Sequence, residues 1–186
     1  IKVKVSEPIV VYREAINGNN VGTSFEGKSP NRHNRFYIEV EMLPQNVVDA
    51  LRAGEFRDGT IRNKDQKEIG DQFAELGMDK DMMRKGYAIN GTNVFINGTK
   101  GIQGLHETRE LLIEGFNEVC KSGPLAGEPA MGMLVRLTGA KLHEDAIHRG
   151  PAQTIPAVRN GINGALVSAG VALLEPKQNV YINVPQ

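Results

Sequence analysis

The sequence predicts a mixed α/β fold (α+β) in which helices cover a β-sheet. Short segments with alternating apolar residues, which are typical of strands, are separated by longer segments whose apolar residues have helical spacing. The chain has 186 residues, a length that suits one compact domain. Together these observations predict the order strand, strand, helices, strand, helix, strand, helix, strand.

The first 42 residues are expected to be extended around a polar loop. Residues 1–5 alternate and residues 9–12 form an apolar run, with Pro8 between them. Residues 17–35 are rich in Gly, Asn, Ser and Pro, which predicts a long polar loop or a loosely paired hairpin with a basic tip. The alternating residues 36–42 predict a strand.

The middle of the chain is predicted to be largely helical. Residues 45–85 carry many charges of both signs with apolar residues at helical spacing, so we expect two amphipathic helices there. Residues 94–96 lie between two Asn-Gly-Thr turns and predict a short strand. From Leu105 to Val119 the apolar residues share one face of a helix, which Gly123 and the proline after it end.

The last part of the chain is predicted to hold a strand, a long helix and a final strand. Residues 131–142 alternate as a strand does. Thr154 suits the N-cap of the following helix, and Pro156 suits its first turn. Glycines within this helix lower its helix propensity, which we attribute to close packing against the sheet. Residues 179–184 alternate again and predict the final strand.

The composition argues against several classes of protein. Lys+Arg and Asp+Glu both number 22, so the formal net charge is zero and any RNA contact must use a local patch. No apolar stretch approaches the roughly 20 residues of a membrane-spanning helix, so we expect no membrane partner. Cys120 is the single cysteine and is expected to be a buried small hydrophobe. The lack of disulfides and of a cleavable leader favours a cytoplasmic location.

Residues 143–148 superficially resemble a zinc motif of metalloproteases. The two histidines, His143 and His148, are five positions apart in the sequence instead of four. On a helix they would therefore lie about 140° apart, and no third ligand is nearby. A metal-dependent hydrolase using these histidines and Glu144 is accordingly the weaker alternative. We predict no catalytic residue, no metal and no cofactor in this chain.

The segment from Lys28 to Arg35 has the groups that contact RNA phosphates. It holds four potential cations in eight residues, among Pro and Asn, with few carboxylates. Cations, amide side chains and exposed backbone are suited to phosphate contacts. The residues alone also allow a solvated loop without a ligand.

Two segments together resemble domain IV of the translation elongation factor 2 family, the archaeal and eukaryotic counterparts of bacterial elongation factor G. They are Ser29-Pro-Asn-Arg-His-Asn-Arg35 and Leu142-His-Glu-Asp-Ala-Ile-His-Arg-Gly150. The resemblance extends over nearly the whole chain. Eukaryotic members usually have Gly-Gly-Gly-Gln where this chain has Gly150-Pro-Ala-Gln153, which favours an archaeal source.

The resemblance implies a domain organisation and a fold. Residues 8–174 would be domain IV, residues 1–7 the tail of the preceding domain, and residues 175–186 the first strand of domain V. The implied fold is like the second domain of ribosomal protein S5, with a left-handed βαβ crossover and a helical side region formed by residues 45–85. Physical reasoning alone favours right-handed crossovers, which make up about 98% of cases.

The resemblance also implies a function. Members of the family catalyse GTP-dependent translocation of tRNA and mRNA on the ribosome, and their GTP and Mg²⁺ bind to a domain outside this chain. The fragment itself is therefore not expected to be an enzyme. His148 is implied to be converted to diphthamide by dedicated biosynthesis enzymes and to accept ADP-ribose from diphtheria-type toxins.

The resemblance further places a group of residues at a tip that contacts the tRNA–mRNA duplex in the ribosomal A site. These residues are Lys28, Ser29, Pro30, Asn31, Arg32, His33, Asn34, Arg35, His143 and Arg149. Among them Arg32, Arg35 and Arg149 are expected to contact phosphate or ribose. A free-standing S5-like RNA-binding protein is the alternative to a translocation factor.

Overall fold

The computed structural model describes residues 10–17, 23–177 and 179–182, and its centre is a mixed six-stranded sheet. The strands are β2 (Phe25–Lys28), β3 (Arg35–Met42), β4 (Gly59–Thr60), β5 (Gly86–Asn90), β6 (Asn93–Asn97) and β7 (Met133–Lys141). Their order is β2-β3-β7-β6-β5-β4. Neighbours are antiparallel except β6 and β7, which are parallel. The mixed α/β class predicted from the sequence is confirmed.

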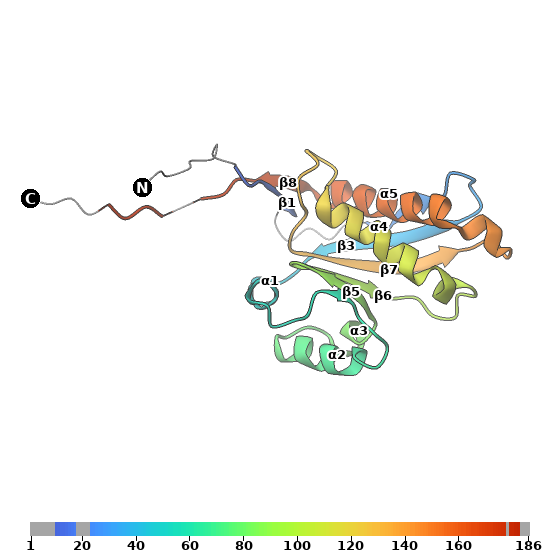
Figure 1. The fold of residues 1–186 in the computed structure, drawn as a ribbon, viewed down its shortest axis with the longest axis horizontal. Helices are drawn as coiled ribbons and strands as arrows, with labels where there is room; N and C mark the ends of the chain where they lie inside the picture. The colour runs from blue at the N-terminus through green and yellow to red at the C-terminus, as the bar shows by residue number, and fades with distance from the viewer. Residues whose placement is uncertain (1–9, 18–22, 178, 183–186) are drawn as a thin grey trace, which may run out of the picture.

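Helices cover the sheet from both sides (Figure 1). One layer consists of the 3₁₀ turn η1 (Leu105–Thr108), α4 (Arg109–Lys121), the 3₁₀ turn η2 (Ala146–Arg149) and α5 (Pro151–Ala169). The other layer consists of α1 (Gln45–Ala53), α2 (Gln66–Glu75) and α3 (Lys80–Met83). Each layer encloses a hydrophobic core, one containing Phe95 and Phe116 and the other containing Phe73 and Leu134. Side chains of β7 contribute to both cores, because successive side chains of a strand point to opposite faces of the sheet.

Most predicted elements are present. The strands predicted at residues 36–42, 94–96 and 131–142 correspond to β3, β6 and β7. The polar segment before β3 is a hairpin, in which β2 pairs with β3. The two amphipathic helices expected within residues 45–85 are α1 and α2, accompanied by the one-turn helix α3 and the short strand β4. Strand β5 was not predicted.

The start of α5 differs from the prediction. Gly150 is the N-cap and Pro151 is the first helical residue, a position that tolerates the missing N–H of proline. Thr154 therefore lies one turn inside the helix, where its hydroxyl donates to the carbonyl of Arg149 at 2.9 Å. Pro156 lies inside the helix as well.

Close packing explains the glycines of α5. A Cβ on Gly161 would lie 2.9 Å from Cδ1 of Ile38, and a Cβ on Gly27 of β2 would meet the carbonyl oxygen of Ala157. The helix and the hairpin can approach this closely only because neither side carries a Cβ here. The predicted contact between helix and sheet is confirmed.

The described ends of the chain form a second, two-stranded sheet. Strand β1 (Arg13–Ile16) pairs antiparallel with β8 (Val171–Leu174), at the left end of the body formed by the helices and the large sheet in Figure 1. Residues 10–12 are not in a strand, and residues 1–5 lie outside the described residues. The strand predicted at residues 179–184 is wrong over residues 179–182, because no described segment pairs with them to form a ladder.

A β6–α4–β7 unit forms the parallel crossover that the resemblance implies. Its left-handedness stays a prediction. No helix in the described part of the chain is long and apolar enough to cross a membrane.

Candidate nucleic-acid interface

Two loops distant in sequence meet at one end of the molecule. The turn at residues 29–34 joins β2 to β3, and the loop at residues 142–150 joins β7 to α5. Arg35 at the start of β3 is the register partner of Lys141 at the end of β7, so the two connections leave the sheet side by side. We call residues 28–35 and 143–149 the tip; it lies at the right in Figure 1, opposite β1 and β8.

Hydrogen bonds within the hairpin turn fix its shape. The N–H of Ser29 donates to the carbonyl of Asn34 at 3.0 Å, and the N–H of Arg32 donates to the carbonyl of Ser29 at 2.8 Å. The N–H of Asn34 donates to Oγ of Ser29 at 2.9 Å, and the N–H of His33 donates to Oδ1 of Asn31 at 3.1 Å. Arg32 adopts φ 61°, in the left-handed region that side chains rarely occupy. The turn thus presents Arg32 and His33 to solvent from a fixed backbone.

Asparagine side chains join the two loops. Asn34 is 0% exposed, and its Nδ2 donates to the carbonyl of His148 at 2.7 Å while its Oδ1 accepts the N–H of His143 at 3.0 Å. Asn31 adds a second donor to the carbonyl of His148 at 3.1 Å. The N–H of Asn31 in turn donates to Oε1 of Gln153 at 2.8 Å. The first loop therefore holds the backbone of the second loop at two points, His143 and His148.

Three imidazole rings gather at the tip. The ring centroids of His143 and His148 are 4.4 Å apart, and His33 lies 5.0 Å from the first and 5.1 Å from the second. Nδ1 of His143 accepts the N–H of Asp145 at 3.1 Å, so that nitrogen carries no proton in this arrangement. His33 is exposed, and the other two rings are half-buried. Within the described ranges, no three or more His, Cys, Asp or Glu side chains are arranged to bind a metal.

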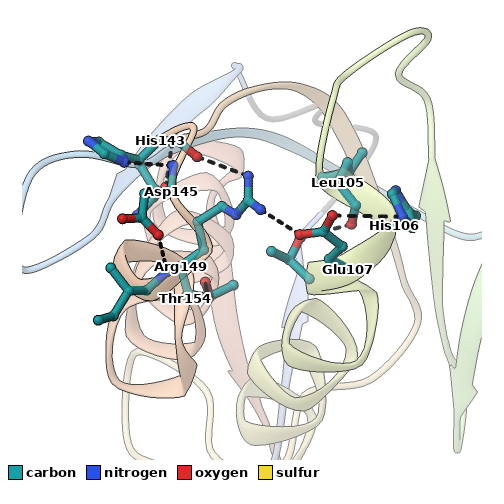
Figure 2. Close-up of polar contacts among 10 residues, drawn as sticks. Leu105, His106, Glu107, His143, Asp145, Arg149 and Thr154 are labelled. Atoms are coloured by element: carbon teal, nitrogen blue, oxygen red, sulfur yellow. Dashed lines mark hydrogen bonds and ion pairs between the residues drawn. The ribbon is translucent and has the colours of Figure 1, made fainter.

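Arg149 is placed differently from the predicted RNA contacts. Its side chain is 8% exposed and lies between the carbonyl of His143, 2.9 Å from Nη1, and Oε2 of Glu107, 2.5 Å from Nη2. Figure 2 shows the guanidinium between the loop that holds His143 and the 3₁₀ turn η1, which holds Glu107. Gly104 leaves the room for it, because a Cβ there would meet the guanidinium. The geometry gives Arg149 a structural role in the tip, and its contact with RNA phosphate or ribose stays a prediction.

The tip residues that the resemblance implies, together with His148, divide into a surface group and a supporting group, while the connecting residues 144–147 are all exposed. The exposed members are Lys28, Pro30, Arg32 and His33; those of intermediate exposure are Asn31, Arg35, His143 and His148; the buried members are Ser29, Asn34 and Arg149. Glu107 and Gln153 hold the tip in place but were not predicted as site residues. No local sequence signal marks them, because their partners lie on other loops.

Cys120 is 5% exposed, and burial raises the pKa of its thiol well above the ordinary value. A thiol that stays protonated is a poor nucleophile, which confirms the expected role as a small buried hydrophobe.

Comparison with known proteins extends these observations. The family described as Elongation factor G, domain IV, matches residues 57–170, a range that includes the His148 loop. Similar relatives named Elongation factor 2 come from Picrophilus torridus, 54% identical, Thermoplasma volcanium, 53% identical, and Methanosphaera stadtmanae, 49% identical. Each alignment covers 100% of this chain and 25% of the relative.

The chain thus spans about a quarter of the length of these relatives. Its mixed sheet with covering helices agrees with the S5 domain 2-like fold that the resemblance implies. These relatives match the chain along its whole length, and the family of domain IV matches residues 57–170. The chain therefore belongs to the elongation factor 2 family, as a segment that contains domain IV.

Proposed function

We propose that this chain is the RNA-contacting part of a translation elongation factor that drives GTP-dependent translocation of tRNA and mRNA on the ribosome. The observation that carries the proposal is the tip, where exposed Arg32 and His33 stand beside His148 on a frame of buried amide hydrogen bonds. A translocation factor must serve every codon, so its contact has to be independent of sequence. Cations and imidazoles directed at phosphates and 2′-hydroxyls meet that requirement.

His148 is, in this proposal, the residue converted to diphthamide and the acceptor of ADP-ribose from diphtheria-type toxins. Its carbonyl is held by two asparagines, while the neighbouring Ile147 is 78% exposed, so an enzyme can reach the loop without unfolding it. An ordinary imidazole is mostly neutral at pH 7, whereas a quaternary ammonium is always charged. The modification would therefore place a permanent cation beside His33 at the RNA-facing end.

The remaining parts of the proposal concern the whole factor. Its GTP and Mg²⁺ bind outside these residues, and the chain described here has no catalytic activity of its own. It works in the cytoplasm with the ribosome, tRNA, mRNA and the diphthamide biosynthesis enzymes as partners. Residues 1–7 belong to the preceding domain, and residues 175–186 begin domain V.

Tandem mass spectrometry of protein from the native organism tests the modification. We expect the added mass of diphthamide on His148. The peptides that carry His33 and His143 serve as internal controls and should be unmodified. An unmodified His148 in native protein would contradict this part of the proposal.

A translation assay with the full-length factor tests the role of the tip. We expect His148→Ala to raise frameshifting more than it lowers GTP hydrolysis, because the tip holds the displaced duplex but does not contact GTP. Lys67→Ala is the control, since Lys67 is exposed on α2 and lies outside the tip. Equal losses of reading-frame maintenance and GTP hydrolysis would refute the proposed role.

A further inference from the structure

We propose that Lys28 and Arg35 of the tip form a phosphate-binding row with Lys141, which lies next to the tip, and that this row holds the backbone of an RNA strand against the open face of the sheet. We call these three residues the cation row. Lys141 was not predicted as a site residue. The inference rests on the proposed function, because it extends the RNA contact of the tip onto the open face of the sheet.

Strand register places the three cations next to one another. Lys28 of β2 is the register partner of Arg35 of β3, and Arg35 is the register partner of Lys141 of β7. Directly opposite residues of antiparallel strands point to the same face, with Cβ atoms about 4.5–5.5 Å apart. The cation row therefore crosses three adjacent strands in a line set by the sheet, unlike cations scattered along a loop.

The face that carries the row is open to solvent. The alternate residues, Gly27, Phe36 and Ala140, point toward α5 and the core beneath it. Side chains of the row consequently point away from α5. The Lys28 and Arg35 side chains are 56% and 43% exposed, and Lys141 is exposed as well.

The charges of the row are only partly balanced. Oε1 of Glu26 lies 3.2 Å from Nη1 of Arg35, and its Oε2 lies 3.9 Å from Nζ of Lys28. Within the part of the chain that the structure describes, Lys141 has no ion pair. Like charges directly opposite one another destabilise a sheet, so this end of the face gains from an added anion.

The same face is balanced farther from the tip. There Arg136 lies 3.6 Å from Glu39 and 2.8 Å from Glu41, measured between guanidinium nitrogens and carboxylate oxygens. Positive charge is thus confined to the end of the sheet next to Arg32 and His33. A ligand that contacts Arg32 and the cation row together would be an extended anion.

An RNA strand suits this surface better than a single phosphate. Neighbouring strands are about 4.8 Å apart, so the row offers a line of charges on a rigid support to a chain of phosphates. Gly139 and Tyr37, the next register pair, lie beside the row. A Cβ on Gly139 would lie 3.2 Å from Cδ2 of Tyr37, so the glycine leaves room for the half-buried ring beside the row. An aromatic ring beside cations is the usual combination for a ribose or base next to bound phosphates.

Salt-dependent binding tests the row with this 186-residue chain and a short A-form RNA hairpin. Each phosphate contact contributes a slope of about 0.7–0.9 in log affinity against log salt. We therefore expect Lys141→Gln to lower the slope by about one and to weaken binding about tenfold at about 50 mM salt, with the difference vanishing toward about 1 M. Lys67→Gln, an exposed lysine on α2, is the matched control and should bind as the parent chain does.

The outcomes separate the row from the proposed function. If Lys141→Gln binds like Lys67→Gln while Arg32→Gln weakens binding, the row is refuted and the tip proposal stands. The row is also refuted if the parent chain does not bind the hairpin at low salt, a result that leaves the mass-spectrometric test of His148 intact. Binding of polyglutamate that depends on Lys141, without a matching effect on RNA, would assign the surface to an acidic protein instead.

A stability measurement distinguishes the loss of an RNA contact from a loss of folding. Because Lys141 faces Arg35 directly, its replacement by Gln should leave the urea midpoint unchanged or raise it. A lowered midpoint together with weaker binding would mean that Lys141 is needed for folding and would contradict the proposal.

Discussion

Replacing Asn34 by alanine should loosen the connection between the two loops of the tip. The change removes the 3.0 Å acceptor of the His143 N–H and one of the two donors to the carbonyl of His148. A buried backbone group without a partner costs about 1–3 kcal/mol, and one further lost hydrogen bond costs about 0.5–1.5 kcal/mol. Since His143 is only half-buried, water recovers part of the first loss, and we expect about 2 kcal/mol of destabilisation.

Urea unfolding followed by circular dichroism measures this loss. The midpoint should fall while the denaturant dependence stays constant, because the surface exposed on unfolding hardly changes. Asn160→Ala is the matched control: Asn160 is exposed on α5, and its replacement should change the stability by no more than about 0.5 kcal/mol. A similarly small effect of Asn34→Ala would refute the reasoning.

Asn34→Asp tests the same contacts through the pH dependence of the stability. A carboxylate keeps the acceptor for the His143 N–H but cannot donate to the carbonyl of His148. Burial disfavours the charged form, so the pKa of the new carboxyl should be raised in the folded state. Its penalty is then absent below the unfolded pKa of about 3.9 and grows as the pH rises through the folded pKa. Relative to the parent chain, Asn34→Asp should lose more stability at pH 7 than at pH 4, whereas the loss in Asn34→Ala should not vary in this way.

Three further perturbations should have measurable effects. Glu14 is 1% exposed and accepts three backbone N–H groups of residues 125–128 at 2.8–3.1 Å, so Glu14→Gln should cost about 1.5–3 kcal/mol and speed amide exchange in that loop. Unchanged exchange would contradict this. Gly27→Ala should cost about 1–3 kcal/mol in urea unfolding, because the new Cβ meets the carbonyl of Ala157; a neutral result would mean that α5 can shift. Burial raises the pKa of Tyr87, so stability should fall as the pH rises from about 10 toward the folded pKa. Tyr87→Phe should lack that component, and an identical alkaline profile would refute it.

Periodicity predicted the elements that are long and amphipathic. Helix α4, strand β7 and most of α5 carry their pattern over nine or more residues, so each was identified from its own sequence. Strand β8 was missed because Val171–Leu174 does not alternate in the sequence, and the segment is a strand through its pairing with β1. Strand β5 was missed for a related reason, since the short segment Gly86–Asn90 does not alternate in the sequence and is a strand through its pairing with β4 and β6.

The two loops that form the tip were predictable, but the arrangement of their side chains was not. Sequence placed its residues on two loops, and the resemblance brought those loops together. Which side chains face solvent depends on partners far along the chain. Arg149 is buried because Glu107 lies against it, and Asn34 is buried because the His148 loop lies against it. Such pairings follow from tertiary structure, so single-sequence patterns cannot distinguish a free cation from a structural one.

The β1–β8 ladder has a mechanical consequence. Arg13 begins β1 and Leu174 ends β8, and these two residues are register partners at the end of the ladder where both connections leave it. A force that pulls the two connections apart therefore acts on one rung at a time and opens the ladder like a zipper, at low force. A thrust along the long axis instead loads α5, β3 and β7 end to end, since all three run in that direction (Figure 1). We therefore expect the β1–β8 ladder to open at a lower force than the one needed to compress the molecule along α5, β3 and β7.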